Sequence, residues 1–261
     1  MLDIDLRRFE ELMIKFNQTC FSDLSNLSDD ELAGSVIIGF DIDWASDFIL
    51  EDTLQLASEL GVRPTLFLTH NSALIRNLFS EGQYEFGLHP NFERLLNGDS
   101  GNGLDAPDVL QRLMHEFPGV DVVRSHSLTT SSRLKALFKS NKFSIESSFI
   151  THGTNNIFPN FWYESSGMLH VPITWEDDVW FTLEEGETNG NASKILRFDK
   201  LNVLTFHPIH LYLNTTDVAH YNASREFINN PDELSKRRKN GEFGVRTIFS
   251  NIANKLRGER L

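Results

Sequence analysis

The sequence predicts an α/β fold in which helices cover a parallel sheet, and three observations support this. Short apolar segments alternate with helical patterns along most of the chain, as in repeated strand–helix units. The apolar segments are uninterrupted, which is typical of parallel strands buried on both faces. Several of them end in ionisable residues. This alternation fits a closed or distorted (β/α) barrel, or an open doubly wound sheet.

The first strand is expected at residues 36–40, and the helical pattern at 50–60 that follows it ends at Gly61, a typical residue after a helix. The same alternation predicts strands at 64–69, 84–88, 120–123, 143–149 and 201–206, and helices at about 71–79, 106–116 and 131–140. The less regular parts are an expected amphipathic helix at 3–17, strand-like pieces near 168–174 and 178–182, and mostly helical structure over 214–260.

No linker or repeat divides the chain, so we expect a single domain over residues 1–261. Within it, the motif-bearing core covers about 36–210 and a C-terminal helical part covers 214–261. The 40% of hydrophobic residues suffice for a sizeable core. The oligomeric state is not defined by the sequence.

Charge and cysteine content narrow the classes of partner. The formal net charge of −13 repels nucleic-acid phosphates, so no nucleic-acid partner is expected. Cys20 is the single cysteine, which excludes an internal disulfide and a cysteine-based zinc site. The N-terminal residues lack the apolar segment of a secretory signal, and no apolar run has the length of a membrane span. We therefore expect a cytoplasmic protein without a membrane span.

Chemically versatile residues follow four of the expected strands. They are Asp41 and Asp43, His89, Arg124 and His126, and His207. Because the carboxyl ends of barrel strands converge on one mouth, where active sites lie, we expect these side chains to meet.

Such a set is suited to metal-dependent hydrolysis. Asp41 and Asp43 are two residues apart and point the same way if the strand extends that far, so a divalent cation would relieve their repulsion. Asp43, His89 and His126 form a three-ligand site with one position open for water, and zinc is the favoured ion. The other carboxylate is then available as a base.

Two further residues complete the expected site. Arg124 is placed to orient Asp41 and keep it ionised through charge-assisted hydrogen bonds. His207, on another strand, is placed to protonate a leaving amine as a general acid.

Each residue alone has a structural explanation, since an aspartate after a strand often caps a helix and a lone histidine is usually packed in the fold. Their combination at successive strand ends favours catalysis instead. Residues given only a structural role are His70, His115, His152, His170, His210 and His220, the tryptophans Trp44, Trp175 and Trp180 as core or pocket wall, and Glu176-Asp177-Asp178 as an exposed acidic turn.

The residues that carry this pattern resemble the NodB-homology motifs of polysaccharide deacetylases, carbohydrate esterase family 4. The motifs occur in the family's order as Gly39-Phe40-Asp41-Ile42-Asp43-Trp44, Gly87-Leu88-His89, Arg124-Ser125-His126 and Leu204-Thr205-Phe206-His207. The chain is most similar to the divergent WbmS-like branch, associated with surface-polysaccharide gene clusters. This resemblance implies a distorted (β/α) barrel, a divalent metal that is commonly zinc, and removal of acetyl groups from N-acetylated sugars.

The chain departs from the family pattern at several positions. The order of family residues makes Asp41 the base and Asp43 the ligand, but Ile42 separates them, so the reverse assignment is the alternative. The family's second motif has two histidines, and only His89 is present. His126 takes the place of the missing ligand, with Asn91 or Glu93 as alternatives. The segment 172–178 holds the place of the fourth motif, where an acidic residue tunes the site, and His207 matches the last motif.

The expected function is metal-dependent hydrolysis of an N-acyl group, acetyl or formyl, from an amino sugar. The substrate is a free, nucleotide-linked or lipid-linked sugar of surface-polysaccharide biosynthesis. The alternative is a catalytically inactive barrel that acts as a glycan-binding or scaffold protein. A phosphoesterase ranks last, because the sequence offers few cationic groups to hold phosphate.

Overall fold

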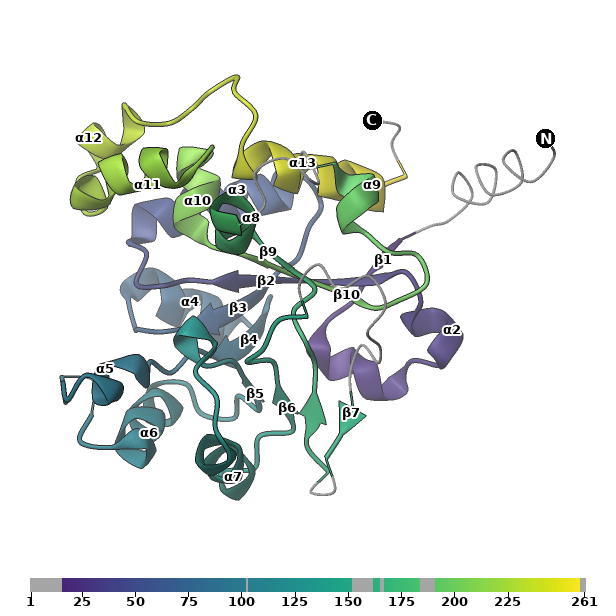
Figure 1. Ribbon diagram of the computed structural model, residues 1–261, viewed down its shortest axis with the longest axis vertical. Helices are drawn as coiled ribbons and strands as arrows, with labels where there is room; N and C mark the ends of the chain where they lie inside the picture. The colour runs from purple at the N-terminus through teal and green to yellow at the C-terminus, as the bar shows by residue number, and fades with distance from the viewer. Residues whose placement is uncertain (1–15, 102, 152–161, 165–166, 184–190, 259–261) are drawn as a thin grey trace.

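The computed structural model describes residues 16–101, 103–151, 162–164, 167–183 and 191–258, and in these ranges one parallel sheet curls into a half-barrel (Figure 1). The strand order is β7-β8-β6-β5-β4-β3-β2-β10-β9, and β1 lies beside β2. The two outermost strands of this path, β7 and β9, do not pair in the described part of the chain. The parallel α/β fold is therefore confirmed, as a distorted barrel.

Every strand pairs in parallel with its neighbour except the β7–β8 pair, which is antiparallel. The strands are β1 (Asn17–Gln18), β2 (Ser35–Asp41), β3 (Thr65–Leu68), β4 (Glu85–Leu88), β5 (Val122–Val123), β6 (Ile145–Glu146), β7 (Trp162–Tyr163), β8 (Leu169–His170), β9 (Trp175–Glu176) and β10 (Asn202–Phe206).

Helices follow most of the strands. Those of the first half are η1 (Phe21–Asn26), α2 (Asp29–Leu32), α3 (Asp47–Glu59), α4 (Ala73–Glu81), α5 (Glu93–Leu96), α6 (Ala106–Glu116), η2 (His126–Leu128) and α7 (Ser132–Ser140). Those of the second half are α8 (Asp177–Leu183), α9 (Ala192–Ile195), α10 (Pro208–Leu213), α11 (Val218–Ser224), η3 (Arg225–Phe227), α12 (Pro231–Ser235) and α13 (Val245–Leu256). Within the described ranges, every helix is too short or too polar to span a bilayer.

Two expected elements differ from the structure. The piece near 178–182 was expected as a strand, but it lies in helix α8, because Asp177 and Asp178 occupy the first turn, where carboxylates favour a helix. Most of the expected helix at 3–17 lies outside the described residues, and its last described position, Asn17, begins strand β1. The helix expected at 106–116 is confirmed as α6.

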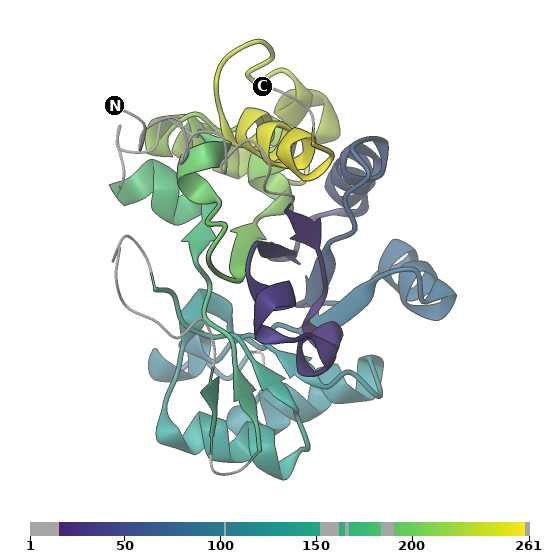
Figure 2. The ribbon, with the colours of Figure 1, turned by 90° about the vertical axis from the view of Figure 1, so that its right-hand side faces the viewer.

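The sheet is buried on both faces. Along β2, the side chains of Val36, Ile38 and Phe40 pack with the surrounding helices, whereas Ile37 belongs to a second apolar cluster on the inner face. The inner cluster also contains Phe21 and residues of η1 and α2, which lie against the curled strands (Figure 2). This alternation explains why the strand sequences are continuously apolar.

An aromatic ring fills the inside of the half-barrel just below the strand ends. Phe67 of β3 lies there, and two glycines on neighbouring strands make room for it. A Cβ atom at Gly87 would lie 2.5 Å from the Phe67 ring, and one at Gly39 would lie 3.1 Å from it. The ring in turn supports the guanidinium of Arg124, whose Cζ is 3.9 Å from the ring centroid.

We predict that Gly87→Ala lowers the free energy of unfolding by about 1–3 kcal/mol, because overpacking at the Phe67 ring forces a shift in a close-packed interior. Urea denaturation measures this change. Ser58→Ala, on the exposed side of α3, is the control and should change stability by less than about 0.5 kcal/mol. Equal stability of Gly87→Ala and the parent protein would contradict the packing described here.

Candidate active site

All the predicted site residues lie at the carboxyl ends of neighbouring strands. Asp41 is the last residue of β2, and His89, Arg124 and His207 directly follow β4, β5 and β10. Since these strands occupy the middle of the sheet, their ends open onto one shared mouth. The structure thus brings together the six residues that the sequence singled out.

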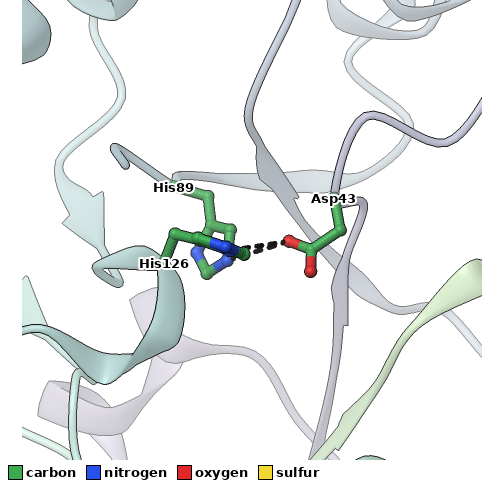
Figure 3. Close-up of side chains that lie close together, drawn as sticks. All are labelled: Asp43, His89 and His126. Carbon is green, nitrogen blue, oxygen red and sulfur yellow. Dashed lines mark hydrogen bonds and ion pairs between the residues drawn. The ribbon is translucent and has the colours of Figure 1, made fainter. Parts of the chain in front are cut away.

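Three of these residues form a compact group of possible metal ligands (Figure 3). The Asp43 Oδ1 atom lies 3.1 Å from His126 Nδ1 and 3.3 Å from His89 Nε2. One ligand atom from each of the three residues lies within 4.8 Å of the others. Ligands at zinc's usual distances in a tetrahedral site are about 3.3 Å apart, so this spacing fits a cation of that kind.

Hydrogen bonds to the backbone fix the imidazole of His89 in this group. Its Nδ1–H donates to the backbone carbonyl of Arg124 at 2.7 Å, so the lone pair of Nε2 faces Asp43. Such a bond to the second ring nitrogen is the usual way that proteins orient a metal-ligating histidine. The backbone N–H of His126 donates to Pro90 at 3.1 Å, which anchors the turn that carries the second imidazole. The donor set and its orientation fit a divalent cation.

The electrostatics of the group favour an ionised Asp43. Burial alone would raise the pKa of this carboxyl, but its side-chain interactions with His126 and His89 outweigh it. Together with the charge of His207, they hold the pKa of Asp43 well below its usual range. An anionic oxygen ligand is therefore present between two imidazoles at neutral pH.

The alternatives to His126 as a ligand have other partners. The Asn91 Oδ1 atom accepts the backbone N–H of Glu93 at 2.9 Å. The Glu93 carboxylate accepts a hydrogen bond from Ser127 at 3.0 Å. Neither interaction involves Asp43 or His89, so His126 is the residue that the structure places in the group.

Arg124 and Asp41 form a buried ion pair beside this group. The Arg124 Nη1 atom lies 2.7 Å from Asp41 Oδ1 and also donates to Thr205 Oγ1 at 2.9 Å. The same guanidinium donates to the hydroxyl and carbonyl oxygens of Ser147. Both partners of the ion pair are almost fully buried, and the second oxygen of Asp41 lies 3.7 Å from His89 Nε2. One oxygen of Asp41 is thus held by the arginine, while the other faces the candidate metal ligands.

His207 is held by a carboxylate that the sequence interpretation misplaced. Asp177 was expected in an exposed acidic turn, yet it is fully buried and accepts hydrogen bonds from the backbone N–H and the Nδ1 of His207, at 2.8 and 2.7 Å. Glu176, also expected in that turn, is buried as well. The other ring nitrogen of His207 lies 3.7 Å from Asp43 Oδ2.

This pairing sets the protonation of the imidazole. Burial raises the pKa of Asp177 to about 6, which still leaves it mostly ionised at neutral pH. Burial alone would lower the pKa of His207, but the Asp177 carboxylate overrides it and raises the pKa of His207 well above its ordinary value. A protonated imidazole therefore faces the mouth of the half-barrel.

Among the residues that the structure describes, two more groups of possible ligands share His207. They are Asp177 with His207 and His210, and Asp41 with Glu176 and His207. In the first, Nδ1 of His207 is already bonded to Asp177, and burial followed by the nearby charge of His207 holds the pKa of His210 well below its usual range. In the second, Asp41 is paired with Arg124. The group around Asp43 is therefore the best candidate for a metal.

Comparison with known proteins agrees with this geometry. The model of the WbmS-like polysaccharide deacetylase family matches residues 38–225. One similar solved structure is the crystal structure of WbmS from Bordetella bronchiseptica, which is described as a candidate polysaccharide deacetylase involved in O-antigen biosynthesis. Its sequence is 33% identical to this chain, and the two structures superpose with a TM-score of 0.83. The alignment covers 92% of this chain and 98% of that one.

Two other solved structures show weaker similarity. A candidate polysaccharide deacetylase from Mycobacterium smegmatis is 17% identical with a TM-score of 0.44, over 85% of this chain and 90% of that one. The Bc1960 peptidoglycan N-acetylglucosamine deacetylase is 15% identical with a TM-score of 0.38, over 80% and 83%. Among curated proteins, none matches the sequence. The family match over most of the chain and the likeness to WbmS show that this chain belongs to the WbmS-like polysaccharide deacetylases.

Proposed function

We propose that this protein is a divalent-metal-dependent hydrolase that removes an N-acyl group, acetyl or formyl, from an amino sugar. The observation that carries the proposal is the meeting of three units at one mouth. These are the ligand group around Asp43, the ion pair of Asp41 with Arg124, and the pair of His207 with Asp177. A ligand set, a base and an acid are the parts that amide hydrolysis at a metal centre requires.

Asp43, His89 and His126 would hold the cation, with zinc as the favoured ion. When bound, such a cation polarises the acyl oxygen and makes a nearby water more acidic. The chain's own residues supply the remaining steps. Asp41 accepts a proton from the attacking water through the oxygen that faces His89, while Arg124 holds its other oxygen in a charge-assisted hydrogen bond.

His207 acts on the leaving group. Water oxygen forms a bond to the acyl carbon, the bond from that carbon to the sugar nitrogen breaks, and Nε2 of His207 gives its proton to the nitrogen. Asp177 keeps the imidazole protonated and fixes its direction through Nδ1. The products are acetate or formate and a free amino sugar.

The similarity of this chain to WbmS supports the proposed class of substrate. That protein is described as involved in O-antigen biosynthesis. By extension, the proposed substrate is an N-acylated amino sugar of surface-polysaccharide biosynthesis, either free or linked to a nucleotide or lipid.

We predict that purified protein incubated with zinc and then desalted retains about one ion per chain, and that Asp43→Ala and His89→Ala each lose most of it, because three ligands are needed for tight binding. Elemental analysis measures the content. His115→Ala is the matched control, because His115 is exposed on α6. Full zinc occupancy in both variants would exclude the proposed metal site.

Asp41→Asn should separate metal binding from catalysis. The variant is expected to keep its zinc but to lose about 10²–10⁴-fold in kcat, the usual contribution of a general base. Acetate or formate release from N-acylated amino sugars measures the rate. If Asp41→Asn loses zinc while Asp43→Ala keeps it, the two aspartates have the reverse roles.

The pairing of His207 with Asp177 predicts a shift in the pH profile. A general acid is active below its pKa, and Asp177 raises the pKa of His207, so the rate should fall on the alkaline side as His207 loses its proton. Asp177→Asn removes the charge and lowers that pKa, and the alkaline limb of kcat/KM should therefore move to lower pH. Asp30→Asn, an exposed position, is the control. An unchanged alkaline limb would show that His207 is not the acid.

A further inference from the structure

The turn between Asp41 and helix α3 has an unusual backbone. Asp43 and Trp44 both have positive φ, 39° and 57°, although neither is glycine. For a bulky residue this conformation is a true outlier, and each such residue costs about 1–3 kcal/mol. The turn is held from both sides, because the backbone N–H of Trp44 donates to Thr69 Oγ1 at 3.0 Å and that of Ala45 donates to Ile42 at 2.7 Å.

The turn presents the indole of Trp44 at the mouth of the site. The side chain is 42% exposed, whereas Trp175 and Trp180 are only 3% and 9% exposed. Its ring lies edge to face with the imidazole of His126, with ring centroids 5.1 Å apart. The indole thus touches one candidate metal ligand and still leaves much of its surface to water, an arrangement that core packing does not explain.

We infer that Trp44 is the platform on which the pyranose ring of the acylated sugar packs; this rests on the proposed function. The C–H groups on one face of a pyranose are apolar and match an aromatic surface, and burying both removes apolar area from water. Because the indole adjoins His126, an acylamino group on the edge of a stacked sugar ring extends toward Asp43 and His89. The strained turn therefore serves two purposes, since it aims the Asp43 carboxylate and the sugar platform together.

Kinetics of Trp44 variants on N-acetylglucosamine, chitotriose and UDP-N-acetylglucosamine test this inference. A platform binds ground state and transition state alike, so Trp44→Ala should raise KM about tenfold while kcat changes less than about threefold. Trp44→Phe, which keeps a smaller ring, should lie between Trp44→Ala and the parent protein. Phe198→Ala is the matched control, because Phe198 is also an exposed aromatic residue but precedes β10 at the opposite end of the strands.

Two readouts distinguish a platform from a support for the His126 ring. Zinc content should equal that of the parent protein in all three variants. Titration of Asp41→Asn with the same sugars should give a saturable change in tryptophan fluorescence that Trp44→Phe abolishes in that background. An unchanged KM in Trp44→Ala, or a raised KM accompanied by zinc loss, overturns the inference.

The proposed function is tested separately, by measuring whether the parent protein releases acetate or formate from the sugars. Acid release together with an unchanged KM in Trp44→Ala means that the hydrolase assignment stands and the platform fails. A Trp44-dependent fluorescence change without any acid release supports the platform and contradicts hydrolysis. If the sugars produce neither signal, both are contradicted.

Discussion

The guanidinium of Arg124 is the interaction on which the mouth of this half-barrel depends. It is fully buried and bonds to Asp41 at the end of β2, to Thr205 in β10 and to Ser147, which directly follows β6. An unpaired charge in this place would cost several kcal/mol, and the contact with Asp41 together with the hydroxyl and carbonyl acceptors offsets that cost. The backbone carbonyl of Arg124 also orients His89. A single residue therefore couples the proposed base to the proposed metal ligands.

The interior of the half-barrel is built to accommodate this charge. Phe67 lies under the guanidinium, and Gly39 and Gly87 leave the space that the ring and the guanidinium fill. A Cβ atom at Gly39 would also lie 3.0 Å from Nη1 of Arg124. Gly87 on β4 thus makes room for the Phe67 ring, and Gly39 on β2 makes room for both that ring and the Arg124 side chain, which follows β5. The packing of the interior and the proposed catalysis therefore depend on the same few positions.

Much of this arrangement could be predicted from the sequence, because parallel strands bring their carboxyl ends to one edge. The runs before Asp41, His89 and His207 identify strands by their apolar character, and convergence then follows from the fold. His126, the proposed third ligand, lies in the group of possible ligands around Asp43, and its role as a ligand stays a prediction. These predictions needed only the apolar pattern of each strand and the rule that the carboxyl ends of parallel strands converge.

Contacts between distant segments could not be predicted in this way. The Glu176-Asp177-Asp178 run looks like a solvated turn, and only the pairing of β9 with β10 shows that Asp177 is buried against His207. The hydroxyl partners of Arg124 leave no pattern in the sequence, since serine and threonine are common everywhere. The exposure of Trp44 depends on two left-handed residues that no local propensity favours. The correspondence of residues 172–178 to the family's fourth motif, where an acidic residue tunes the site, was the signal in the sequence that pointed to this region.

A crystal structure of the protein soaked with zinc tests the central claim most directly. The account predicts one ion at about 2.0–2.2 Å from Asp43, His89 and His126, the usual range for oxygen and nitrogen ligands. Asp41 should remain outside that shell, with its carboxylate still bonded to Arg124. An ion bound between Asp177, His207 and His210, or one that draws Asp41 away from Arg124 into its coordination shell, would contradict it.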